Sequence, residues 1–192
     1  MFANPVLQSA RPLPLTPTVP AFLAAAPALP LPSFMKDQEH SNWCWTAVAT
    51  SVGLLFGTGQ WTQCDTATSC LPNQDCCKAP GPCNVYGPLD AALSHTKSLA
   101  GPERAGRADP TIFEPELDAG HPVCVRVAWF AGGAHFLAIT GYDDPGTVND
   151  QIMLDLQDPE FGPSRILLGY FPQAYRTVGG DWTYFYLTAP QP

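Results

Sequence analysis

The hydrophobic pattern of this chain changes from helical to strand-like, and the change comes near residue 122. Before it, residues 43–56 form an almost continuously apolar helical run that ends at Gly57. Shorter helical patterns follow at 88–98 and 111–119. After it, runs rich in Val, Ile, Phe and Tyr are separated by Gly and Asp turns, and they span residues 122–130, 135–142, 151–156 and 182–188. Helices first and antiparallel strands second is the order typical of an α+β fold.

At 192 residues the chain suits one compact domain, preceded by a segment of different composition. Residues 1–33 contain eight prolines and almost no charge, which indicates an extended, polyproline-like arm before a domain at 34–192. The arm is a leader without fixed structure, a segment that packs on the domain, or a pro-segment that covers the active site. Ala24-Ala25-Ala26 resembles a signal-peptide cleavage site, but the prolines before it break the helix that a signal peptide needs. No apolar run is long enough to cross a bilayer, so we expect no membrane insertion.

The charge balance excludes two classes of partner. Seventeen acidic residues against nine basic ones give a formal net charge of −8. A protein that binds nucleic acid needs a basic surface to displace counterions from the phosphates, and the sequence has no such cluster. An anionic membrane surface is a poor partner for the same electrostatic reason. We therefore expect that the chain binds neither nucleic acid nor a membrane surface.

Seven cysteines are many for a cytosolic enzyme, and five of them lie within the 20 residues 64–83. The surrounding segment, 60–87, is rich in Cys, Pro, Asn and Gly, which predicts a loop that needs covalent staples to hold its shape. The odd count suits one working thiol and six cysteines that pair. Cys76 and Cys77 are adjacent and there is no C-x-x-C pair, so we expect no zinc site. These features favour an oxidising compartment and a secreted or exported protein.

Cys44 stands in the first turn of the apolar helix, after Ser41 and Asn42, which are good N-cap residues. A helix N-terminus stabilises a thiolate, so Cys44 is a candidate nucleophile; the alternative is a small apolar core residue. Gln38 lies six residues earlier. Its amide can donate to an oxyanion beside the nucleophile, together with the backbone N–H of Cys44. The spacing between the two residues favours the catalytic interpretation.

Two segments resemble papain-like cysteine peptidases. The run Gln38 to Trp45 (QEHSNWCW) is similar to the active-site segment of that family, in which a Gln precedes a Cys-Trp pair by this spacing. The run Ala134 to Tyr142 (AHFLAITGY) is similar to the family's second signature, a His that opens an apolar strand ending in Gly-Tyr. Bacterial members, among them double-glycine leader peptidases and secreted effector proteases, are the most similar. The resemblance implies a papain-like fold, with a helical half carrying the Cys and an antiparallel, barrel-like half carrying the His.

The resemblance also implies roles for individual residues. Cys44 would be the nucleophile and His135 the general base, and a third residue would accept the other ring N–H of the histidine and orient it. Asp158, in the run LQDP after the next strand, is the best candidate, because bacterial relatives have an Asp-Pro pair at this place. Its rivals are Asp155 and, in a hairpin turn, Asp143 and Asp144.

The remaining cysteines, one tryptophan and the other histidines also have expected places in the fold. Similar bacterial proteases carry a Gln-Cys pair and a Cys-Cys cluster, which implies a disulfide-stapled loop here, formed by Cys64, Cys76, Cys77 and Cys83. Cys70 and Cys124 then form a third bridge or stay reduced, and Cys124 also fits the core. Papain-like enzymes place a Trp over the histidine, and Trp182 is the candidate by position. The remaining histidines are expected at the surface: His40, His95 and His121.

These inferences predict a cysteine peptidase that acts on protein or peptide substrates and needs no metal or cofactor. One alternative is another amide-acting enzyme on the same triad, such as an acyltransferase, a deamidase or a cell-wall amidase. Another is a non-catalytic binding module on a protease-like fold. The small, stapled domain and the Pro-rich arm are also compatible with an effector or toxin that is delivered into another cell.

Overall fold

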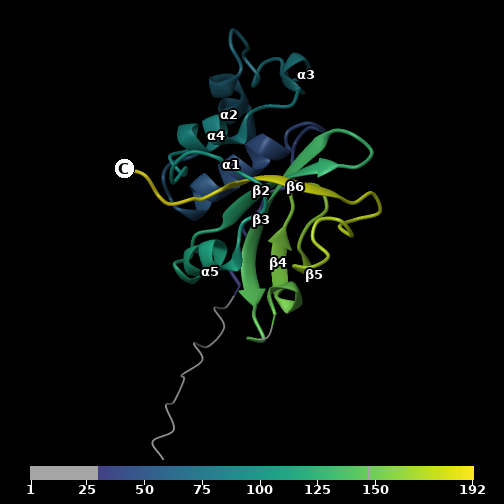
Figure 1. Ribbon diagram of the computed structural model, residues 1–192. Helices are drawn as coiled ribbons and strands as arrows, with labels where there is room; N and C mark the ends of the chain where they lie inside the picture. The colour runs from purple at the N-terminus through teal and green to yellow at the C-terminus, as the bar shows by residue number, and fades with distance from the viewer. Residues whose placement is uncertain (1–29, 147) are drawn as a thin grey trace, which may run out of the picture.

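The computed structural model describes residues 30–146 and 148–192. Most of the predicted arm and the candidate cleavage site at 24–26 therefore lie outside the described residues. Figure 1 shows a helical half, α1 to α4, against a sheet half, with α5 beside the sheet. The predicted α+β class is confirmed. The helices are α1 (Cys44–Leu55), α2 (Gln63–Cys70), α3 (Pro80–Cys83), α4 (Leu89–His95), α5 (Pro110–Asp118) and the 3-10 helix η1 (Asn149–Gln151).

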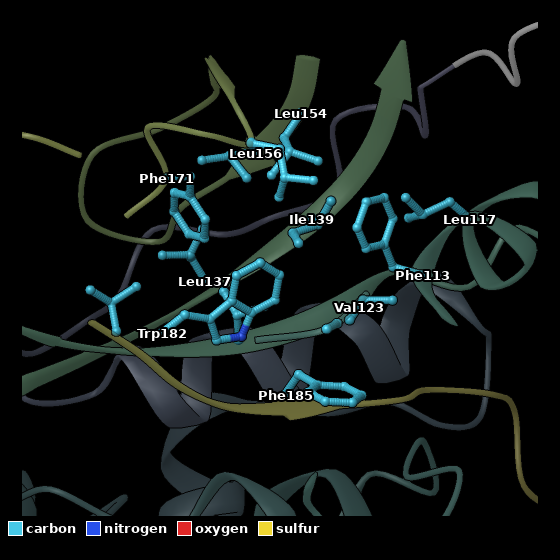
Figure 2. Close-up of a cluster of buried hydrophobic side chains, with 14 of the residues drawn as sticks. Phe113, Leu117, Val123, Leu137, Ile139, Leu154, Leu156, Phe171, Trp182 and Phe185 are labelled. Carbon is cyan, nitrogen blue, oxygen red and sulfur yellow. The ribbon is translucent and has the colours of Figure 1, made fainter. Parts of the chain in front are cut away.

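The strands form one antiparallel sheet in the order β1-β6-β2-β3-β4-β5. Their bounds are β1 (Arg104–Ala105), β2 (Val123–Trp129), β3 (Ala134–Asp143), β4 (Met153–Gln157), β5 (Ser164–Leu167) and β6 (Gly180–Tyr186). Because side chains alternate along a strand, the central strands face two cores. Val123, Val125 and Val127 point into the core shown in Figure 2. Cys124 points the other way, into a second core shared with α1.

Helix α1 is the centre of the helical half, and every residue from Cys44 to Gly53 is buried. The predicted N-cap at Ser41 and Asn42 is wrong: the N-cap residue is Trp43, with no side-chain cap. The Asn42 side chain instead donates to the Asn84 carbonyl at 2.8 Å, so it ties the helix start to the stapled segment.

The predicted end of this helix is confirmed. Gly57 has a φ of +65°, which a residue without Cβ adopts easily. Its N–H donates to Leu54 O, and Thr58 N–H donates to Gly53 O, so two of the last carbonyls are satisfied.

The segment 60–87 differs in part from the predicted loop, because it contains α2 and the short α3. Two disulfides, Cys64–Cys77 and Cys76–Cys83, staple it. Cys70 and Cys124 are reduced, and Cys124 lies in the core. Indole N–H groups on α1 and at its start bind the far end of the segment: Trp43 donates to Cys83 O and Trp45 to Val85 O. The staple thereby fixes the chain next to Cys44.

The first described residues, 30–35, run along β3 and β4. Leu31 N donates to Thr140 O at 2.8 Å. The Gln157 side chain accepts from the backbone N–H groups of Phe34 and Met35 and donates to Pro32 O. Residues 30–35 are thus held against the sheet. In this part of the chain, as in all the residues described, no helix is long and apolar enough to cross a membrane.

Candidate active site

Cys44 and His135 come from the two halves of the molecule and meet between them. Cys44 is the first residue of α1, and His135 is the second residue of β3. The Cys44 side chain is close enough to the His135 ring to raise the pKa of that ring. Both side chains are almost fully buried, with exposed fractions of 3% and 2%. The arrangement can bring a helix-borne thiol to a substrate carbonyl with an acid–base group beside it.

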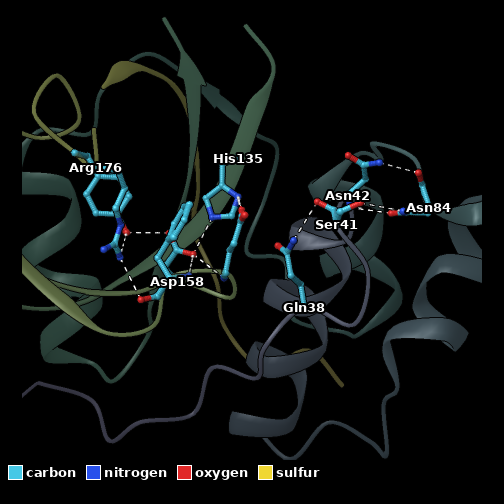
Figure 3. A network of polar contacts seen from close by, with 10 residues as sticks. Gln38, Ser41, Asn42, Asn84, His135, Asp158 and Arg176 are labelled. Carbon is cyan, nitrogen blue, oxygen red and sulfur yellow. Dashed lines mark hydrogen bonds and ion pairs between the residues drawn. The ribbon is translucent and has the colours of Figure 1, made fainter. Parts of the chain in front are cut away.

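Asp158 lies directly after β4 and holds the opposite side of the His135 ring. The Nε2–H of His135 donates to Asp158 Oδ1 at 2.9 Å (Figure 3), so Nδ1 is the ring nitrogen that this bond leaves available. The same Oδ1 accepts the backbone N–H groups of Glu160 and Phe161, and Oδ2 accepts the hydroxyl of Tyr175 at 2.8 Å. Four donors therefore fix this carboxylate in one orientation.

The rival aspartates lie elsewhere. Asp155 pairs with Arg165 Nε at 2.8 Å, and Asp143 lies 3.9 Å from the same guanidinium. Asp144 accepts the backbone N–H of Gly146. Of the four candidates named from the sequence, Asp158 alone reaches His135.

The electrostatics of the pair favour two charged partners. Burial lowers the pKa of His135, but hydrogen bonds to Asp158 and Cys44 and the charges of both groups outweigh this and raise it to about 10. Burial raises the pKa of Asp158, but its bond to His135 and the two backbone donors bring it below the ordinary value. The imidazolium and the carboxylate are therefore both charged at neutral pH.

Gln38 lies on the irregular segment that leads into α1. Its backbone N–H donates to Pro159 O at 2.8 Å, which couples Gln38 to the turn that carries Asp158. Its Nε2 donates to Ser41 O at 3.0 Å, and this carbonyl requires a donor, so the amide orientation is defined. One N–H of Nε2 remains for a ligand. The Oε1 atom is buried and accepts no hydrogen bond within the described residues.

Aromatic rings enclose the histidine. Trp129 stacks on His135 with ring centroids 5.8 Å apart and 20° between planes, and Phe161 meets the ring edge-on at 5.8 Å. Trp182, the candidate from the sequence, packs instead against Phe171 in the core. The sequence analysis missed Trp129, the last residue of β2. Its backbone N–H donates to Gly133 O across the tight turn into β3. Because this short hairpin brings the end of β2 close to the start of β3, it was the signal that could have placed Trp129 near His135.

Tyr175 and Arg176 extend the network and were also missed. Arg176 Nη2 donates to the Tyr175 hydroxyl at 3.1 Å, and that hydroxyl donates to Asp158. Burial and the charge of Asp158 raise the pKa of Tyr175, so it stays a donor at neutral pH. Glu160 places a carboxylate oxygen 3.8 Å from His135 Nδ1. These residues lie in turns, where no periodic pattern marks their direction.

The other histidines stay apart from this cluster. His40 meets Trp43 edge-on, His95 bonds Ser69, and His121 lies 3.2 Å from Glu116. The described residues contain one group with the spacing of metal ligands, and it comprises Cys64, Asp65 and Cys77. Because the two cysteines form a disulfide, they offer no thiolate to a metal.

An α+β fold in which a helix-borne thiol faces a strand-borne imidazole is the arrangement of papain-like cysteine peptidases, and the chain is an enzyme of this class. More narrowly, the family model described as papain-like cysteine protease AvrRpt2 matches residues 28–176, so the chain belongs to this family. No curated protein gives a significant match. Among solved structures, the crystal structure of a double glycine motif protease from an AMS/PCAT transporter, in complex with the leader peptide, aligns with a TM-score of 0.46 and 14% identity, over 86% of this chain and 95% of that one.

Proposed function

We propose that this peptidase hydrolyses peptide bonds with Cys44 as nucleophile, His135 as acid–base group and Asp158 as the residue that orients the imidazole. Gln38 Nε2 and the Cys44 backbone N–H would bind the oxyanion. The single observation that supports the proposal best is the buried 2.9 Å hydrogen bond between His135 and Asp158, together with the influence of Cys44 on the pKa of the same imidazole.

The reaction follows from these groups. The Cys44 thiolate attacks the carbonyl carbon, and a C–S bond forms while the oxygen takes the negative charge. Protonated His135 gives its proton to the leaving amine as the C–N bond breaks, and a thioester remains on Cys44. Water then gives a proton to His135 and attacks the thioester carbon. The C–S bond breaks, the carboxylic acid product leaves, and the Cys44 thiolate and protonated His135 are restored.

The first test is covalent labelling of Cys44. The folded protein is treated briefly with a peptide-like chloromethyl ketone, and intact mass spectrometry counts the adducts. We expect one adduct, on Cys44, that forms faster than any on Cys70, the free thiol that is only half-buried. A Cys44→Ala variant should take up none on this time scale, and a Cys70→Ser variant should label like the wild type. Labelling of Cys70 before Cys44 would contradict a nucleophilic role for Cys44.

A second assay separates hydrolysis from related amide chemistry. A synthetic peptide library is incubated with the enzyme, and mass spectrometry detects new termini. New N-termini that depend on Cys44 support peptide-bond hydrolysis. Side-chain deamidation or transfer of the acyl group to an added amine, with no chain cleavage, would replace the proposed reaction with one of the alternatives.

We also propose that the protein acts outside the reducing cytosol of the cell that makes it, as an exported protease or an effector delivered into a target cell. The support is the pair of disulfides, Cys64–Cys77 and Cys76–Cys83, since such bonds persist in oxidising compartments. Rapid thiol alkylation of producing cells, followed by mass spectrometry of cell and medium fractions, tests this. We expect the oxidised form outside the cytosol; a fully reduced, active enzyme confined to the cytosol would refute it.

A further inference from the structure

A cavity of about 520 Å³ opens between the two halves of the molecule, beside the strand that carries His135. The stapled segment and the β2–β3 hairpin line it, with Tyr86, Gly87, Pro88, Arg126, Gly133, Ala134 and Phe136. Ala134 and Phe136 flank His135 on β3, with their side chains on the opposite face of the strand, and Gly87 lies against the ring of Trp45, the residue after Cys44. The cavity therefore borders the backbone next to both Cys44 and His135, and we take a peptide bound at these groups to pass it. None of the four proposed catalytic side chains belongs to its lining. We call it the Arg126 pocket.

Strand register places the arginine in the pocket. In β2, Val125 and Val127 face the sheet core, so Arg126 shares the opposite side with Cys124. Cys124 is covered by the core that includes α1, whereas Arg126 is only half-buried and lines the cavity. Its cross-strand neighbours are Phe136 on β3 and Tyr184 on β6.

The guanidinium of Arg126 has few partners. Its Nη1 donates to Thr183 Oγ1 at 2.8 Å, and the group lies 5.9 Å from the centre of the Tyr184 ring. Within the described residues no carboxylate comes within ion-pair distance of it, whereas Arg107 and Arg165 both have aspartate partners. Since a guanidinium carries five N–H donors, most of them remain for a ligand. A half-buried cation that has no ion-pair partner and lines a cavity between the two halves indicates an anionic ligand group.

We propose that the Arg126 pocket is a subsite that selects an acidic side chain, glutamate or aspartate, in the peptide substrate close to the scissile bond. The inference rests on the proposed function, because it takes the substrate to lie across Cys44 and His135. Arginine binds a carboxylate through two parallel N–H···O bonds. The rings of Tyr86 and Phe136 offer apolar surface for the methylene groups of the ligand side chain.

The charge of the whole chain makes this contact discriminating. With a net charge of −8, the protein as a whole disfavours the approach of an acidic peptide, and a local cation such as Arg126 offsets this. An acidic residue is therefore accepted where it meets Arg126 and disfavoured at other positions. Selectivity then arises from attraction at one subsite and repulsion around it.

The experiment uses two pools of short fluorescent peptides that differ only in their acidic residues: one contains Glu and Asp, and the other has Gln and Asn in their place. Wild-type enzyme is incubated with each pool, and mass spectrometry locates the cut sites. We expect an acidic residue to be enriched at one fixed position relative to the cut. For a matched pair of peptides with Glu or Gln at that position, kcat/KM should favour Glu by about 10-fold.

The variants assign this preference to Arg126. In Arg126→Gln the ratio between the Glu and Gln peptides should fall to near one, and Arg126→Lys, which keeps the charge, should retain part of it. Arg104→Gln is the matched control, because it removes the same charge from an exposed arginine on β1 that lies over Phe185. It should keep the wild-type ratio. An unchanged ratio in Arg126→Gln, or cut sites with no acidic preference, overturns the proposal.

A binding measurement separates this inference from the catalytic proposal. Fluorescence anisotropy records the binding of both pools to the inactive Cys44→Ala variant and to Cys44→Ala combined with Arg126→Gln. Preferential binding of the acidic pool that is lost with Arg126→Gln supports the pocket even if no peptide is cleaved. If Cys44 labels as proposed and both pools bind equally, the catalytic proposal stands and the pocket assignment fails.

Discussion

At the scale of single residues, the site depends on how firmly one carboxylate is held. Asp158 is 1% exposed and accepts from His135, from two backbone N–H groups and from Tyr175. Each donor offsets part of the cost of burying its charge. Because the donors come from different directions, they also prevent the carboxylate from rotating away from the imidazole. Tyr175 is the one side chain among them besides His135, so it is the one that substitution can remove.

Replacing Tyr175 with Phe should impair turnover without weakening substrate binding. The variant keeps the ring stack on Trp129, with centroids 6.2 Å apart, and loses the hydroxyl that donates to Asp158 and accepts from Arg176. Loss of one such bond is expected to lower kcat by about 3- to 10-fold, with KM unchanged. Loss of a donor to the anion also raises the pKa of Asp158, so the acidic limb of the pH–kcat profile should move to higher pH.

The matched control is Tyr170→Phe, which removes a hydroxyl from an exposed tyrosine five residues away. It should leave kcat and the pH profile at their wild-type values. If Tyr175→Phe and Tyr170→Phe behave alike, the hydroxyl has no positioning role and Tyr175 is only a packing residue.

The sequence pointed to the candidate residues that local context marks and missed the neighbours that only distant contacts bring to the site. Cys44 and His135 each stand at a recognisable element start, and Asp158 follows a strand and precedes a proline. Trp129 and Tyr175 approach the histidine through a hairpin and a turn, and no local pattern gives their direction. For the same reason position alone pointed to Trp182, which the fold directs into the core.

At the scale of elements, the stapled segment 60–87 shapes the helical half. Its composition predicted a loop, but α2 forms within it because Thr62 caps the helix, accepting the Asp65 N–H at 3.1 Å. Helix α2 has few apolar residues, so no hydrophobic periodicity marks it in the sequence. The two-residue strand β1 is likewise invisible in the sequence, since it exists only by pairing with β6. The long apolar helix and strands were predictable because their own periodicity defines them.

Removal of the Cys76–Cys83 bridge should destabilise the protein and slow reaction at Cys44. Cys83 O accepts from Trp43 and the nearby Val85 O from Trp45, so loosening this loop loosens both sequence neighbours of Cys44. For a loop of this length we expect the Cys76→Ser/Cys83→Ser variant to lose about 2–3 kcal/mol of unfolding free energy. Urea denaturation measures the loss, and the rate of chloromethyl ketone labelling reports on the site.

The control for this bridge is Cys70→Ser, which removes a half-buried thiol in the same segment without breaking a bridge. Its unfolding free energy should stay within about 0.5 kcal/mol of the wild type. Equal stability of the double variant and this control would mean that the bridge does not constrain the loop.

At the scale of the whole molecule, the site couples the two halves, because Cys44 belongs to one core and His135 to the sheet that carries the other. The charged His135 is held by groups from both sides, Cys44 on α1 and Asp158 after β4. Each half alone would leave the histidine without one of these partners. Protonation of the site and folding of the molecule are therefore linked.

This linkage gives the pH dependence of stability a definite sign. The pKa of His135 is about 10 in the folded chain, above the 6.5 of an unperturbed histidine. A group whose pKa is raised on folding contributes stability that is fully present below about pH 6.5 and is lost as the pH rises towards 10. Urea unfolding should thus show that the free energy of unfolding falls by at least about 1 kcal/mol between pH 7 and 9.5.

Asp158→Asn removes the main group that raises this pKa. Its free energy of unfolding should therefore depend less on pH over the same range, whatever its absolute stability. His95→Gln, a change at a histidine outside the site, should keep the wild-type slope. A wild-type curve as flat as that of Asp158→Asn would show that the buried imidazole carries no charge in the folded molecule.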